Sequence, residues 1–303
     1  MDMKTMTVAL AALLLGGNTA PQAAPAAPAP APAMVDADPA LWVVKDKDTT
    51  IYLFGTIHVL KPGLSWFDEA VKTAFDKSDQ LVLEMVAPEP AAMQALAIKT
   101  GFTASGPTLP EKLGEADRAA YLKTLGEFGI PAAALDRAKP WMAAITLTSM
   151  PLIKLGYDIN QGPEHVLTAA ATAAKKPVIG LETAEEQLGI FDTLPEAVQI
   201  KFLDQTVRDL PKAGEEIGKM VSSWNAGDPD ALAKTMNEGM VEQPEVGKAL
   251  LTDRNIRWAN WIDNRLKTPG TVFIAVGAGH LAGQDSVQVQ LGKHHLTATR
   301  VKY

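Results

Sequence analysis

Short apolar runs separated by long helical stretches dominate the chain from residue 38 onward. Residues 41–44 and 50–54 alternate or run apolar on either side of the polar turn 45–49, and this pattern predicts a β-hairpin. Other apolar runs stand beside Gly, Pro or polar residues, as buried strands do. These further predicted strands are residues 81–85, 177–181, 271–276 and, at one edge, 296–301.

The segments between these runs carry little strand signal and are expected to be helical. Pro195 opens one helix with an apolar stripe at helical spacing, and Thr183 with Glu186 forms a capping box for the helix before it. Another helix is expected over 244–266. Together the pattern predicts an α/β (α+β) fold in which short strands are separated by long helical blocks.

The N-terminal residues have the pattern of an export signal. Lys4 precedes the apolar run Met6–Leu15, which is shorter than the roughly 20 residues that a bilayer span needs. We expect a signal peptide over 1–20, an Ala/Pro-rich linker over 21–37 and one folded domain over 38–303, located in the periplasm or outside the cell. A short membrane anchor is the alternative interpretation of the first segment; after signal cleavage no stable membrane span is expected.

Composition narrows the possible chemistry. The chain has 303 residues, of which 47% are hydrophobic and 21% charged, with a formal net charge of −7 and no basic cluster that would attract a phosphate backbone. Nucleic acid is therefore not an expected partner. The sequence contains no cysteine, which removes thiol nucleophiles, disulfides and Cys-based zinc sites. Any metal ion would have to be held by His and carboxylate groups.

The ends of the predicted strands carry the candidate chemistry. Two strands lead into the same Gly-x-x-His arrangement, which ends at His58 in one case and at His280 in the other. Two further strands end at Glu84 and Glu182. Side chains at the carboxyl ends of neighbouring parallel strands converge on one crevice, so we expect these four residues to share a site.

Two kinds of catalysis fit two imidazoles and carboxylates. His58, His280, Glu84 and Glu182 could hold a divalent Mn, Co or Zn ion, which lowers the pKa of a bound water. Alternatively, one His acts as a general base without metal while a Glu holds its tautomer. Arg254, placed on the predicted helix 244–266 among apolar positions, could stabilise an oxyanion or orient Glu84.

Each of these residues also has a purely structural interpretation. A His after a strand can be a satisfied structural residue, and Arg254 can form a structural salt bridge. Glu84 follows apolar residues in a buried strand and needs a cationic partner, whereas Glu182 also suits the positive end of the next helix. His165, His294 and His295 are expected to be surface residues.

Several segments together resemble the TraB/GumN family, whose better-known relatives are the Tiki metalloproteases. They are LWVVKDKDTTIYLFGTIHVL, LVLEM, VIGLETAEEQ, RNIRW and VGAGHLAGQDSVQVQLGKHHLTATRV, in that order from Leu41 to Tyr303. The resemblance implies a central mixed sheet with helical insertions, similar to erythromycin esterase and the ChaN-like haem-binding lipoproteins. By analogy with Tiki, it also implies a divalent cation held by His58 and His280, with Glu84 as ligand or base.

Other positions match or depart from the family's pattern. Arg254 and Asn255 match its Arg-Asn pair, and the segment with Glu182, Glu186 and Gln187 matches its Glu-rich segment. The departure is at Glu164, between Pro163 and His165, where relatives usually have an aspartate.

The leading hypothesis is an exported metal-dependent hydrolase, specifically a peptidase, that acts on a peptide or small ester. In it, His58 and His280 bind the ion, Glu84 ligates it or deprotonates the water, and Arg254 stabilises the oxyanion. A metal-free esterase is the second hypothesis. The third is a non-catalytic protein that binds haem, metal or an envelope polymer in the same cleft.

Overall fold

The computed structural model describes residues 34–240 and 243–302, without the side chains of 236–240. The predicted signal peptide and most of the predicted linker lie outside these residues. The strand β1 (Val35–Asp36) pairs in parallel with β4 (Leu64–Ser65), so ordered pairing begins just before Asp38, where the folded domain was expected to start.

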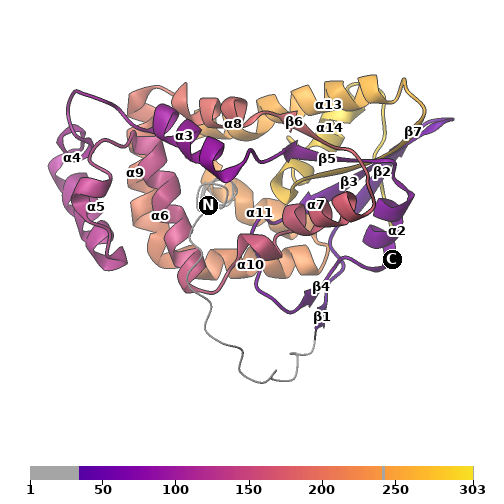
Figure 1. Cartoon of the computed structure of the whole chain (residues 1–303), viewed down its shortest axis with the longest axis horizontal. Coiled ribbons are helices and arrows are strands. Elements are labelled where there is room, and N and C mark those ends of the chain that lie inside the picture. Colours follow the sequence, from indigo (N-terminus) through magenta and orange to yellow (C-terminus); the bar gives the residue numbers. More distant parts are fainter. Residues whose placement is uncertain (1–33, 241–242, 303) are drawn as a thin grey trace.

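A six-stranded mixed sheet in the order β6-β5-β7-β3-β2-β8 is the core of the fold and lies in the right-hand half of the view in Figure 1. Its strands are β2 (Leu41–Lys45), β3 (Thr49–Thr56), β5 (Gln80–Met85), β6 (Val178–Glu182), β7 (Gly270–Gly277) and β8 (Thr299–Arg300). The predicted hairpin is confirmed as the antiparallel pair β2–β3, and β8 closes the edge next to β2. The four strands β3, β7, β5 and β6 run parallel.

Helices fill the two intervals between strands where helical insertions were predicted. The first interval contains α3 (Pro90–Gly101), α4 (Leu109–Lys112), α5 (Glu115–Phe128), η1 (Ala132–Ala134), α6 (Pro140–Lys154), η2 (Ile159–Gln161) and α7 (Pro163–Ala173). The second contains α8 (Ala184–Asp192), α9 (Glu196–Asp209), η3 (Leu210–Lys212), α10 (Ala213–Asn225), α11 (Pro229–Met240), α12 (Pro244–Gly247), η4 (Lys248–Thr252) and α13 (Asp253–Arg265). Outside these intervals lie α2 (Glu69–Lys77), η5 (Ala278–Leu281) and α14 (Val287–Gly292).

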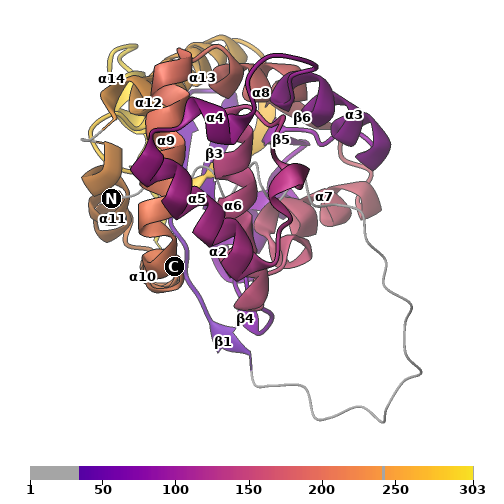
Figure 2. The same ribbon diagram turned by 90° about the vertical axis from the view of Figure 1, so that its left-hand side faces the viewer.

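The alternation of side chains along the strands sends each strand's apolar residues to both faces of the sheet. Ile51 and Leu53 pack with Trp258 and Ile262 of α13 on one face. Phe54 and its neighbours pack on the other face with α2, α7 and α10. Helices α3, α5, α6, α8 and α9 build a separate apolar cluster beside the sheet, seen nearest the viewer in Figure 2. The α/β architecture is confirmed.

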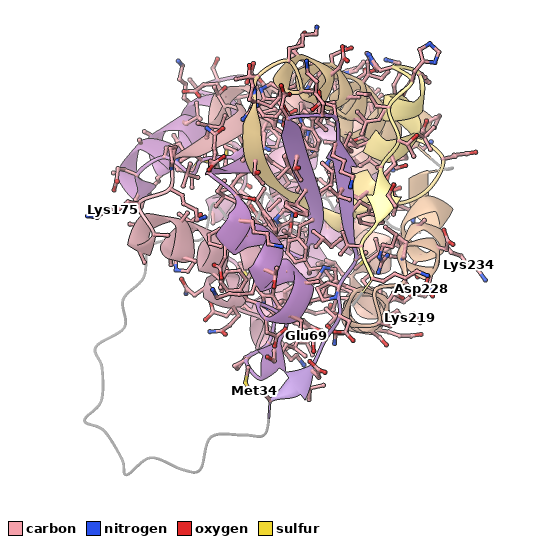
Figure 3. All side chains as sticks on the ribbon, turned by 90° about the vertical axis from the view of Figure 1, so that its right-hand side faces the viewer. Met34, Glu69, Lys175, Lys219, Asp228 and Lys234 are labelled. Atoms are coloured by element: carbon pink, nitrogen blue, oxygen red, sulfur yellow. The ribbon has the colours of Figure 1, made fainter. Side chains whose placement is uncertain are left out.

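Figure 3 views the molecule from the other end, with Lys175 after α7 to the left and Lys219 on α10 and Lys234 on α11 to the right. Apolar side chains of α7, α10 and α11 belong to the same cluster on one face of the sheet. Among the described residues, no helix is both long and apolar enough to cross a bilayer.

One predicted helix contains an unexpected irregularity. The segment expected to be helical over 244–266 is helical, but the turn η4 has the wider π-helical winding. Such turns shift the phase of the helix that follows them. Here η4 directly precedes Arg254, which lies at the start of α13 and points into the interior, with only 5% of its surface exposed.

Candidate active site

Strand pairing brings the two Gly-x-x-His motifs together. Thr56, at the end of β3, lies opposite Gly277 at the end of β7, so His58 and His280 leave the sheet at the same edge. On the other side of β7, Met85 of β5 lies opposite Glu182 of β6. The expected convergence of strand ends is therefore present in the structure.

Arg254 joins three of the predicted site residues in a buried cluster that we call the ionic floor: Glu84, Glu182, Arg254 and His280. Its Nε donates to both oxygens of Glu182, at 3.0 and 2.9 Å. Its Nη2 donates to Glu84 at 2.5 Å and to Glu182 at 2.7 Å. Its Nη1 donates to the carbonyl of Leu250 at 3.2 Å and to Nε2 of His280 at 2.9 Å. These bonds use every N–H of the guanidinium group.

The contact with Arg254 fixes the protonation of His280. Because an arginine only donates, Nε2 of His280 must be the acceptor. Its Nδ1 lies 2.5 Å from the Asn255 side-chain oxygen, and the Asn255 amide nitrogen is held by the carbonyl of Asp285 at 2.8 Å. The proton of His280 is therefore on Nδ1. Burial and the charge of Arg254 hold the pKa of His280 well below its ordinary value, so the ring is neutral.

Glu84 is held as an anion. Burial alone would raise its pKa, but the charge of Arg254 and the backbone N–H of Gly277, which donates to it at 2.6 Å, bring the pKa well below the ordinary range. The side-chain amide of Gln187 adds long contacts of 3.3 Å to both Glu84 and Glu182. The net effect is a buried carboxylate that stays ionised.

His58 has a different partner, Glu164, and we call the two the His58–Glu164 pair. Glu164, in the first turn of α7, lies 2.5 Å from Nδ1 of His58 and accepts a hydrogen bond from the hydroxyl of Thr56. Burial alone would lower the pKa of His58, but the charge and hydrogen bond of Glu164 and the charge of Glu84 raise it above its ordinary value. His58 is the more basic of the two imidazoles.

A glycine allows α7 to approach this closely. Gly162 precedes the helix, and a Cβ placed on it would overlap the carbonyl oxygen of His58. The backbone of Leu60 also bonds to that of Asp158, at 3.3 and 3.0 Å, which ties the chain after His58 to the turn before α7. The position of Glu164 is therefore set by backbone contacts as well as by its side chain.

A cavity of about 250 Å³ opens beside the His58–Glu164 pair. Its polar lining comes from His58, Glu84, Glu164, His165, Thr168 and Gln187, and its apolar lining comes from Leu83, Met85, Val86, Ala87 and Ile159. Arg254, Glu182 and His280 do not line it but lie buried behind Glu84. Of the two expected catalytic histidines, only His58 faces this space.

Three of the four expected metal ligands, Glu84, Glu182 and His280, are bound by side-chain cations. Glu182 binds Arg254 and also Arg257, at 2.8 Å, and Nε2 of His280 accepts from Arg254. Across residues 34–240 and 243–302, no three His, Asp or Glu side chains are grouped so as to hold a metal ion. The guanidinium of Arg254 bonds to both Glu84 and Nε2 of His280, so with Arg254 in place these residues do not fit a metal ion. Metal binding stays a prediction.

Sequence reasoning missed Glu164, Thr56 and Arg257 as parts of the site. Glu164 was noticed only as a departure from the family's pattern, and no spacing in the sequence indicates that α7 packs against His58. His165 is exposed, as expected, but it lines the rim of the cavity. His294 lies elsewhere, 3.8 Å from Asp263.

Comparison with known proteins finds relatives that span most of the chain. The chain is 24% identical over 257 residues to the uncharacterized protein YbaP of Escherichia coli (strain K12), an alignment that covers 84% of this chain and 92% of the relative. It is 22% identical over 265 residues to an uncharacterized protein of Treponema pallidum (strain Nichols), covering 81% and 78%. No solved structure matches. The model of the TraB/PrgY/gumN family matches residues 40–300, and the chain therefore belongs to that family.

Proposed function

We propose that this protein is a hydrolase that cleaves a peptide or small ester, with His58 as the general base. The observation that carries the proposal is the His58–Glu164 pair on the wall of the cavity. Glu164 holds Nδ1 of His58, which leaves Nε2 free to take a proton from a water molecule in the cavity.

His58 first accepts a proton from water and later returns it to the leaving group. Nε2 of His58 removes a proton from water, and the hydroxide attacks the carbonyl carbon of the substrate. The protonated His58 then gives that proton to the leaving oxygen or nitrogen as its bond to the acyl carbon breaks. The ionised Glu84 and Glu164 both stabilise the positive charge that His58 carries between these steps.

A metal-dependent peptidase is the second candidate, and one observation favours it. Both imidazoles have Nδ1 next to an oxygen acceptor, an arrangement common for metal-bound histidines. A Cβ added at Gly277 would lie 3.0 Å from Oε1 of Glu84 and 3.2 Å from Nε2 of His58. These two potential metal-ligand atoms therefore both lie next to Gly277. The obstacle is Arg254, which would have to release Nε2 of His280.

One set of assays separates the two candidates. The purified protein is incubated with p-nitrophenyl butyrate and with a pool of unmodified peptides, with and without EDTA. We expect hydrolysis that EDTA leaves unchanged and that His58→Ala reduces about 10²- to 10⁴-fold. His294→Ala, remote from the cavity, is the matched control and should retain the parent rate. Loss of activity in EDTA, restored by Mn²⁺, Co²⁺ or Zn²⁺, would instead support the metal-dependent peptidase.

Visible absorption spectroscopy tests the non-catalytic alternative, a protein that binds haem in the same cleft. A visible absorption band that appears on haem addition and is lost in His58→Ala, together with no hydrolysis of either substrate by the parent, would contradict the hydrolase and favour a binding protein.

The proposed location is the periplasm or the cell exterior. Its support is the pattern of Lys4, the apolar run Met6–Leu15 and the Ala/Pro-rich stretch after it, all from the sequence. Mass measurement of the N-terminus of the mature protein, isolated from its native host, tests this proposal: a start within residues 21–28 is expected, and an intact Met1 would contradict it.

A further inference from the structure

The cavity beside His58 is lined by two kinds of side chain. The polar lining consists of the His58–Glu164 pair, Glu84, Gln187, His165 and Thr168, and most of the apolar lining comes from residues 83–87 on either side of Glu84. Met85, Val86 and Ala87 follow Glu84 directly, and Ile159 of η2 adds a further apolar side chain to the lining. The apolar part therefore begins next to the reacting group.

The charges around the cavity disfavour an ionic guest. Glu84 is already paired with Arg254, and Glu164 already bonds to Nδ1 of His58 and to Thr56, so both carboxylates are engaged by side chains of the protein. An anion would face both carboxylates, because Arg254 is buried behind Glu84 and does not reach the lining. Moving a charge from water to an apolar wall without a partner costs several kcal/mol.

The volume of the cavity sets the size of the guest. An apolar protein cavity of about 150 Å³ holds a molecule of benzene, with its six carbons. By the same ratio, a cavity of about 250 Å³ holds about ten carbon atoms. The part of a substrate that enters is thus comparable to a medium acyl chain or to a large apolar side chain.

We propose that this cavity is the acyl subsite of the enzyme and that it selects substrates with an uncharged, mainly apolar group of about six to ten carbons next to the scissile carbonyl. This inference rests on the proposed function, because it places the carbonyl at His58. Two classes of substrate have such a group on the acyl side of the bond that is cleaved. They are esters with a medium acyl chain and peptides with a large apolar residue.

Binding is measured first, because it does not require turnover. The probe is octan-2-one, an uncharged carbonyl compound that cannot be hydrolysed, titrated by calorimetry into the full chain and into its His58→Ala variant. We expect both proteins to bind it, with the Kd falling about fourfold for each methylene added from hexan-2-one to octan-2-one. A charge at the far end of the chain, as in 7-oxooctanoate, should weaken binding at least about tenfold.

Two tryptophan variants locate the binding. Ala87→Trp adds an indole at an exposed position of the apolar lining and should raise the Kd of octan-2-one at least about tenfold. Ala91→Trp is the matched control, since Ala91 is exposed nearby but does not line the cavity. It should leave the Kd within about twofold of the parent value. Equal effects of the two variants, or a Kd independent of chain length, would overturn the inference.

Hydrolysis then separates this inference from the proposed function. The rates for p-nitrophenyl acetate, butyrate and octanoate, and for Leu and Ala in the acyl position of a blocked p-nitroanilide, are compared as kcat/KM. A preference for octanoate or for Leu supports the acyl subsite and tells which source of apolar group is used. Hydrolysis with no such preference overturns the subsite but leaves the hydrolase standing. Chain-length-dependent binding of the ketones without any hydrolysis contradicts the hydrolase while the apolar selectivity of the cavity stands.

Discussion

The two Gly-x-x-His motifs end in histidines with opposite electrostatic surroundings. His280 belongs to the ionic floor, where it accepts a hydrogen bond from Arg254 and is only 3% exposed. His58 belongs to the His58–Glu164 pair and faces the cavity. The same motif at the end of neighbouring parallel strands therefore yields one neutral imidazole that acts as an acceptor and one basic imidazole that can move a proton. The difference is made by an arginine from α13 and a glutamate from α7, neither of which belongs to the motif.

The largest effect is expected from removal of the cation of the ionic floor. Arg254→Met leaves Glu84 and Glu182 buried without their principal partner, and the loss of one partner from a buried ion pair costs about 3–5 kcal/mol. Urea denaturation followed by circular dichroism measures the free energy of unfolding.

Arg257→Met is the matched control for Arg254→Met. Arg257 binds the same Glu182 but is 53% exposed, so its removal should cost less than about 1 kcal/mol. If the two variants lost equal stability, the ionic floor would not be a buried, tightly coupled unit.

The second-largest effect is expected on the rate of hydrolysis, from a change in the His58–Glu164 pair. Glu164→Gln keeps an acceptor for Nδ1 of His58 but removes the negative charge, and we expect the rate of hydrolysis to fall about 10- to 100-fold. Because His58 must be neutral to act as a base, the parent rate should rise with pH through the raised pKa of His58. In Glu164→Gln this rise should move to lower pH, since the main influence that raises the pKa is gone.

Thr56→Val provides the control for that shift. It removes the hydroxyl that donates to Glu164 but leaves the carboxylate charge, so the rise in rate should stay much closer to that of the parent. An unchanged pH profile in Glu164→Gln would contradict the role of Glu164.

The smallest effect is a pair of opposite changes in how stability depends on pH. The pKa of folded His280 is below its ordinary value of 6.5, so the unfolded chain takes up a proton first and stability falls as the pH drops below that value. The pKa of folded His58 is above 6.5, so its contribution is fully present below 6.5 and is lost as the pH rises through the raised pKa. His280→Asn should therefore flatten the loss of stability between pH 7 and pH 5, and His58→Asn should steepen it.

Denaturation series at several pH values between 5 and 8 test this pair of variants against the parent. If both substitutions changed the slope of the unfolding free energy against pH in the same direction, the pKa values of His58 and His280 would not be shifted in opposite directions.

Much of the fold and part of the site could be predicted from the sequence. The strands were readable because short apolar runs beside Gly or Pro are typical of buried strands, and the parallel-sheet rule brought His58, His280 and Glu84 to one edge. That rule acts through the backbone, so it does not depend on details of side-chain packing. The same reasoning led from Glu84 in a buried strand to a cation, which the structure supplies as Arg254.

The rest depends on how helices pack, which a single sequence does not encode locally. Nothing in residues 163–165 indicates that Glu164 meets His58, because the contact requires α7 to lie against the sheet edge. The π-helical turn before Arg254 has no sequence signal either, yet it lies just where the helix turns this side chain toward Glu84 and Glu182. The packing of α7 against His58 and the orientation of Arg254 after η4, and not the Gly-x-x-His motifs, thus separate the ionic floor from the His58–Glu164 pair.

The parallel pairing of β3 with β7 joins segments some 220 residues apart in the chain. Pairing between segments so far apart in the chain slows folding, because a long loop has to close before the contacts form. During synthesis, a nascent chain that has not yet delivered β7 has no Gly277 to hold Glu84 and no His280 beside it. The proposed site can thus form only after β7 has left the ribosome, and a nascent chain that ends before β7 lacks it.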